Sequence, residues 1–181
     1  MSIINEIKAH IEAGKDINQF HGEKTALFCF LDSYYQLDIN DDEELQLPLA
    51  QRKGNVCNHL KWLFVHGADI NGGNDWKPLM LAVGNLDVAM TEYLLNRGAD
   101  PHYDLPNEGI PYGCGNYYID DLDIAALDES FEAHPDKAVF DRILRIAVLL
   151  ARHGVSDVHT HCISIDSLTR TVRVSQAKAM Y

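Results

Sequence analysis

Four copies of one phrase constrain the fold of this chain more than any other feature. Each copy is an apolar run with helical spacing that stops at a glycine and a short turn. The copies read AHIEAGKDIN at 9–18, WLFVHGADIN at 62–71, YLLNRGADPH at 93–102 and LLARHGVSDV at 149–158. Glycine readily takes the left-handed conformation that ends many helices, so we expect helix ends at Gly14, Gly67, Gly98 and Gly154. Repetition with matching flanks predicts one supersecondary unit used several times.

The stretch around the third copy shows the longest pattern. Residues 75–102 read DWKPLMLAVGNLDVAMTEYLLNRGADPH. This stretch resembles the ankyrin repeat, which carries a T-P-L-H-x-A box, a helix ending L-L-x-x-G and a G-A-D turn. The matching residues are Pro78, Leu79, Leu81, Ala82, Leu94, Leu95, Gly98, Ala99 and Asp100. Weaker matches lie at 24–31 and 120–127, and the histidine of the box is replaced throughout, by Phe28, Met80 and Asp123.

The resemblance implies an all-α fold, a short ankyrin-repeat solenoid of helix-turn-helix units. The four glycines are 53, 31 and 56 residues apart, whereas the family repeats every ~33 residues. We therefore expect insertions around 36–55 and 102–119, with a smaller extension at 128–137. The predicted organisation is a single domain, 1–181. Its parts are an N-terminal helix (1–18), unit 1 with an insertion (19–71), unit 2 (72–102), unit 3 with an insertion (103–158) and a divergent C-terminal cap (159–181).

Local signals agree with these units. Pro78 suits the first turn of a helix, and Thr25, Asp120 and Asp121 are suitable N-caps at the corresponding starts. Apolar stripes predict helix faces, among them Ile143, Leu144, Ala147 and Leu150 before the last glycine. The C-terminal stretch 162–174 alternates like a hairpin but also fits a capping helix, so the pattern leaves both open.

The charge distribution narrows the class of partner. The net charge is −12, and no Lys or Arg lies between Arg97 and Lys137. Direct binding of nucleic acid is therefore not expected, because phosphate contacts need a basic footprint. A protein with a basic surface is the complementary partner, although an acidic face can also serve solubility alone. No apolar run reaches the ~20 residues of a membrane span and MSIINEIKAH is no signal peptide, so we expect a cytoplasmic chain that is monomeric when free.

The insertion of unit 3 and the repeat surface supply the candidate binding residues. A long loop on a rigid scaffold often carries function, and tyrosines anchor partners at low entropic cost, although these rings can instead cover the stack. The resemblance adds turn tips and the first helix of each pair, including Asp32, Ser33 and Gly84. The predicted partner-binding residues are Asp75, Trp76, Asn85, Tyr103, Tyr112, Tyr117, Tyr118, Asp120, Asp121, Asp123 and Asp128.

Patterns for catalysis or cofactors are weak. The chain has no nucleophile motif, zinc-protease motif or phosphate loop, and the aspartates at 120–123 suit a helix start, so we predict no enzyme activity and no cofactor. His159, His161 and Cys162 form the one plausible metal cluster, but the sequence shows no third or fourth ligand and favours a pair of surface histidines, so no metal is predicted. Four dispersed cysteines give no disulfide framework, and Cys29 is expected to be buried and inert.

The predicted function is a non-catalytic protein-protein interaction module that binds or inhibits a basic protein through an acidic, tyrosine-rich face. An immunity protein that neutralises a nuclease-like toxin is a specific form of this hypothesis. Two alternatives stay open. One is a bivalent structural adaptor that uses the acidic insertion and the slightly basic C-terminal part. The other is a metal-dependent activity at the HTHC segment (159–162).

Overall fold

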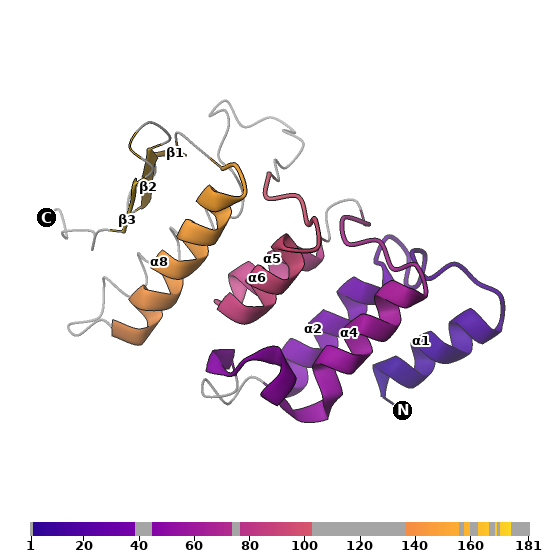
Figure 1. Ribbon diagram of the computed structural model, residues 1–181. Coiled ribbons are helices and arrows are strands. Elements are labelled where there is room, and N and C mark those ends of the chain that lie inside the picture. Colours follow the sequence, from indigo (N-terminus) through magenta and orange to yellow (C-terminus); the bar gives the residue numbers. More distant parts are fainter. Residues whose placement is uncertain are drawn as a thin grey trace, which may run out of the picture. The chain divides into compact units, whose positions relative to one another are not determined.

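The computed structural model describes residues 2–38, 45–73, 77–102, 137–155, 158–159, 163–166, 169 and 171–174. The chain is mostly helical, with a small antiparallel sheet near its C-terminus (Figure 1). The all-α prediction is therefore right for most of the chain and incomplete at this sheet. Two compact units, Met1–Ala99 and Asp100–Tyr181, are described in turn. The single-domain organisation stays a prediction.

The first unit is a set of packed helices. Its elements are α1 (Ile3–Glu12), α2 (Ala26–Asp38), the short 3-10 helices η1 (Leu49–Gln51) and η2 (Lys53–Asn55), α4 (Val56–Val65), α5 (Pro78–Gly84) and α6 (Val88–Leu95). α2 packs against α1, α4 and α5, and α5 also packs against α6. Each α-helix of this unit contributes fully buried side chains, including Ile7, Leu27, Leu60, Leu79 and Leu94. No single stripe of this size would fold alone, so the helices depend on their neighbours.

Helix starts follow the predicted local signals. The Thr25 hydroxyl accepts a hydrogen bond from the Phe28 backbone N–H at 3.2 Å, which caps α2. Pro78 occupies the first turn of α5, where its missing N–H leaves no helical bond unmade. Asp87 caps α6 by accepting from the Met90 N–H at 3.0 Å. The predictions for Thr25 and Pro78 are confirmed, whereas Asp120 and Asp121 lie outside the described residues.

All four glycine-stopped phrases end their helices in the same way. Gly14, Gly67, Gly98 and Gly154 have φ of 75°, 87°, 92° and 109°, in the left-handed region. In each phrase the N–H after the glycine donates to the carbonyl five residues earlier, at 3.0–3.2 Å. These bonds run from Lys15 to His10, Ala68 to Leu63, Ala99 to Leu94 and Val155 to Leu150. This is the Schellman arrangement, so the predicted helix ends are confirmed.

The turns after three of these glycines also share their hydrogen bonds. Two residues after Gly14, Gly67 and Gly98, an aspartate accepts from the backbone N–H two positions further on, each time at 2.9 Å. These pairs are Asp16 with Asn18, Asp69 with Asn71 and Asp100 with His102. The aspartate therefore fixes the direction in which the following side chain leaves the turn.

Those following side chains connect one phrase to the next. Asn18 donates from Nδ2 to the carbonyl of Gly67, and Asn71 donates to the carbonyl of Gly98, both at 3.0 Å. Asn18 also accepts from the Asp69 N–H at 2.8 Å. We call these contacts the asparagine ladder. In the second unit, His102 at the equivalent position brings its Nε2 within 3.5 Å of where a Cβ on Gly154 would stand.

The second unit combines one helix with a three-stranded sheet. α8 (Lys137–Arg152) packs against β2 (Ile163–Asp166) and β3 (Thr171–Val174), and β1 (Val158–His159) pairs with β2. The order is β1-β2-β3, and the antiparallel register places Val158 opposite Ile165 and Ile165 opposite Val172. The hairpin alternative for 162–174 is therefore correct and the capping helix is wrong.

Burial in the second unit follows the amphipathic pattern of α8. Ile143, Ala147 and Leu150 are buried as predicted, whereas Leu144 is 37% exposed and lies outside the core. β2 buries the alternate residues Ile163 and Ile165. A strand explains this burial, because successive side chains of a strand point to opposite faces. The apolar residues of so short a segment also fit the period of a helix, so the sequence alone does not distinguish the two.

The two predicted insertions have different outcomes. The first, around 36–55, is described at 36–38, where α2 continues, and at 45–55. The second part lies against the helices, because Leu45, Leu49 and Arg52 are all buried. The region 102–119 lies outside the described residues apart from His102, and 128–137 lies outside them apart from Lys137.

The glycine conformations give a first prediction. Gly67→Ala should lower the free energy of unfolding by about 1–2 kcal/mol, because an L residue is strained in the left-handed region. Gly84 is the matched control, since it is exposed and helical and, like Gly67, would place its Cβ in open space. Gly84→Ala should raise the stability by about 0.5 kcal/mol. Urea denaturation measures both, and effects of the same sign would contradict this account.

The asparagine ladder gives a second prediction. Asn18→Ala and Asn71→Ala should each cost about 1 kcal/mol, because each substitution removes a bond between successive phrases. Asn58→Ala, an exposed position on α4, should change stability by less than about 0.5 kcal/mol. Chemical denaturation followed by circular dichroism would measure the three variants. Equal stability of all three would show that the ladder contributes nothing.

Candidate functional site

Of the predicted binding residues, Asn85 alone lies in the part of the chain that the structure describes. The residues outside the described part of the chain are Asp75, Trp76, Tyr103, Tyr112, Tyr117, Tyr118, Asp120, Asp121, Asp123 and Asp128. Asn85 is described, at the end of α5. Its Nδ2 donates to the Leu81 carbonyl at 2.8 Å, so the side chain closes the helix while staying partly accessible.

The repeat surface predicted from the first helices of the pairs is accessible in the first unit. Among the side chains of α2 that the structure describes, only Asp32, Ser33 and Gln36 are not buried. Gln36 donates to Asp32 at 3.0 Å, one helical turn apart. On α5, the neighbouring first helix, Gly84 is exposed and Asn85 half-buried. We call Asp32, Ser33, Gln36, Gly84 and Asn85 the first-helix face.

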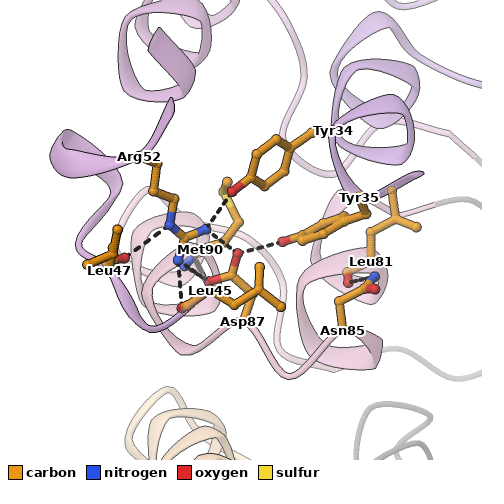
Figure 2. A network of polar contacts seen from close by, with 9 residues as sticks. All are labelled: Tyr34, Tyr35, Leu45, Leu47, Arg52, Leu81, Asn85, Asp87 and Met90. Atoms are coloured by element: carbon orange, nitrogen blue, oxygen red, sulfur yellow. Dashed lines mark hydrogen bonds and ion pairs between the residues drawn. The ribbon is translucent and has the colours of Figure 1, made fainter. Parts of the chain in front are cut away.

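A fully buried ion pair lies in the same unit. The side chains of Arg52 and Asp87 are both 0% exposed, and Arg52 Nη1 lies 2.5 Å from Asp87 Oδ2. Nη2 donates to Oδ1 at 2.6 Å, so the pair is bidentate. Figure 2 shows the carboxylate between Arg52 and Tyr35, whose hydroxyl donates to Oδ2 at 3.0 Å.

The rest of the guanidinium is satisfied by the chain around it. Nε donates to the Leu47 carbonyl and Nη2 to the Leu45 carbonyl, each at 3.0 Å. Nη1 also lies 3.4 Å from the hydroxyl of Tyr34 (Figure 2). Burying a charge is costly unless it is paired and hydrogen-bonded, and both conditions hold. Arg52 thus fastens the described part of the first insertion to the start of α6.

The ionisation of this cluster follows from its burial. Burial opposes the charged form of Arg52, but the hydrogen bonds and charge of Asp87 outweigh it, so the pKa of Arg52 is raised. Burial, followed by the charge of Asp87, raises the pKa of Tyr35 well above its ordinary value. Tyr35 therefore stays a neutral donor, and its contribution to stability is lost only as the pH rises above the ordinary tyrosine range. The side chains of Arg52, Asp87, Tyr34 and Tyr35 are all buried, so this cluster offers no exposed group to a ligand and its role is structural.

Sequence reasoning did not find this ion pair. Asp87 carried a usable signal, because an aspartate directly before an apolar helical run is a common N-cap. Arg52 carried little, since pairing it with a residue 35 positions away requires knowledge of the fold. The path of the insertion therefore could not be predicted, although its existence could.

Cys29 and the potential metal ligands among the described residues form no reactive or metal-binding site. Cys29 is buried as predicted, and this burial raises the pKa of its thiol to about 11, which keeps it protonated and unreactive at neutral pH. Within the described ranges, no three His, Cys, Asp or Glu side chains are grouped to hold a metal ion. His161 and Cys162 lie outside those ranges, so the HTHC alternative stays untested. Each helix that the structure describes is too short or too polar to cross a membrane.

Comparisons of this chain with protein-family models, with curated proteins and with solved structures return no match.

The buried ion pair gives a third prediction. Arg52→Met should destabilise the protein by about 3–5 kcal/mol, because it leaves Asp87 charged and buried without its partner. Asp87→Asn should also be destabilising, since the guanidinium then lacks its counter-charge. The double variant should lose less stability than the two single variants lose in sum. A double-mutant cycle measured by chemical denaturation would give this difference.

The exposed Lys61 on α4 supplies the control for this cycle. Lys61→Met should change stability by less than about 0.5 kcal/mol. Strict additivity of Arg52→Met and Asp87→Asn would show that the two side chains do not stabilise each other in solution.

Proposed function

We propose that this chain is a non-catalytic protein-binding module, built on ankyrin-type repeats, that binds a basic protein in a fixed ratio. The observation that carries the proposal is the repeated turn: the glycine geometry recurs in four phrases, the aspartate bond in three and the asparagine link in two. Repeats that stack in this way give extended surfaces, which such proteins use to bind partners.

The first-helix face supports the choice of binding surface. Its accessible side chains are polar or acidic and belong to short, well-packed helices, so binding would order little additional chain. The net charge of −12 supports a basic partner, because opposite charge accelerates the encounter of two proteins. In the proposal, the tyrosine-rich segment 103–118 and the aspartates at 120, 121, 123 and 128 supply further contacts to the same partner.

Ankyrin repeats imply a solenoid of three units, and part of that expectation has support. In the proposal, the helix pair α2 and α4 forms unit 1 and the pair α5 and α6 forms unit 2. α8 is taken as the second helix of unit 3, and it ends at a capped glycine as α4 and α6 do. An immunity protein that masks a nuclease-like toxin is the specific form of the proposal. Such a toxin is basic where it meets phosphate, which matches an acidic inhibitor.

The binding test gives a fourth prediction. The partner is first captured from the native source with the full chain, then purified and titrated by calorimetry. We expect one partner per chain. Asp32→Lys and Asn85→Lys should weaken binding about tenfold or more, because they place positive charge on the proposed face.

Two exposed positions outside this face serve as matched controls. Glu12→Lys on α1 and Asn96→Lys at the end of α6 make the same charge changes and should alter affinity by about twofold or less. A captured partner that binds all four variants equally would contradict the choice of surface. The absence of any partner that rebinds the purified chain would contradict the proposed function itself.

A further inference from the structure

The second helices of the first unit carry a surface of different chemistry from the first-helix face. α4 contacts α1 through Lys8, whose Nζ lies 5.6 Å from the centre of the Trp62 ring. On its other flank α4 contacts α6, where the Phe64 and Tyr93 ring centres are 6.3 Å apart. Figure 1 shows α4 between α1 and α6. An aromatic ring therefore lies on each side of this helix.

Each of these aromatic contacts holds a cation. The guanidinium carbon of Arg97 lies 4.9 Å from the centre of the Phe64 ring and 4.7 Å from that of Tyr93. Lys8 and Arg97 are exposed, whereas the rings below them are half-buried. A cation over an aromatic face gains about 0.5–1 kcal/mol at an exposed site and loses part of its freedom. Lys8 and Arg97 are thus positioned before any partner arrives.

The side of α4 that faces outward between the two cations ends in an apolar residue, Val65. Asn58, Lys61 and Val65 follow at spacings of three and four residues, so they share one side of the helix. Val65 is 82% exposed, a large apolar side chain in water beside Trp62. His66 stacks on the Trp62 ring with centres 4.0 Å apart. We call Lys8, Lys61, Trp62, Val65 and Arg97 the α4 patch.

The cations of this patch form no ion pair with the carboxylates that the structure describes. Among the described residues, none of Lys8, Lys61 and Arg97 lies within ion-pair distance of an Asp or Glu, although acidic residues outnumber basic ones by 27 to 15 in the chain. Positive charges held over aromatic rings with an apolar centre match a partner with negative charges around an apolar side chain. Nucleic acid fits poorly, because three cations on a chain of net charge −12 give little counterion release.

From this surface we infer a second binding site, the α4 patch, which takes an acidic segment of another protein with a large apolar residue that packs against Val65. The site lies on different helices from the first-helix face and has the opposite charge. It does not depend on the basic partner proposed above.

The test, a fifth prediction, titrates the full chain with a synthetic 12-residue peptide of Glu and Asp that carries two leucines. In a Trp76→Phe background, Trp62 is the one remaining tryptophan and reports binding by fluorescence. We expect a dissociation constant below about 100 μM that weakens as salt screens the charges. Replacing both leucines of the peptide with serine should weaken binding about fivefold or more, because the apolar contact is lost.

Three substitutions locate the site on the chain. Arg97→Gln, Lys8→Gln and Val65→Ser should each weaken binding about threefold or more, whereas Lys53→Gln, an exposed lysine on η2, should leave it unchanged. Val65→Ser is made at an exposed position, so it tests the patch without disturbing the core. The inference is overturned if the peptide does not bind, if the patch variants bind like Lys53→Gln, or if a 20-nucleotide single-stranded RNA binds more tightly than the peptide.

Discussion

The carboxylate of Asp87 is the group on which the arrangement of the first unit depends. It caps α6, receives the Tyr35 hydroxyl from α2 and pairs with Arg52 from the first insertion. These three segments are far apart in sequence, and each satisfies part of one buried charge. A buried carboxylate that lacked any of these partners would be strongly unfavourable, so the segments are expected to assemble together.

This shared acceptor explains how the predicted first insertion is held against the helices of the first unit. The described part of the insertion contributes Leu45 and Leu49 to the core and uses its own carbonyls to hold Arg52. This part therefore belongs to the packed unit. The packing shows no boundary where the sequence predicts that the insertion ends.

Features that depend on near neighbours in sequence could be predicted, and those that depend on distant neighbours could not. The four helix ends and the Thr25 and Pro78 starts follow from the conformational and capping preferences of single residues, and the sequence predicts all of them. The Arg52–Asp87 pair joins positions 35 residues apart, and no local sequence pattern predicts such a pair. The secondary structure of the C-terminal segment could not be assigned from sequence for another reason. Its apolar residues fit both the helical and the strand period, and only the pairing of β2 with β3 selects the strand. Of the candidate site, the first-helix positions Asp32, Ser33, Gly84 and Asn85 are accessible as the resemblance implied, whereas the α4 patch follows from contacts between helices and had no signal in sequence.

The asparagine ladder bears on how such a chain can change its length. Each rung takes its donor from the turn of one phrase and its acceptor from the glycine of the next, so the second phrase offers a donor to one neighbour and an acceptor to the other. A duplicate of the second phrase would bring both groups already in register with both sides. The chain could therefore gain copies of this phrase by recombination while keeping every bond of the ladder.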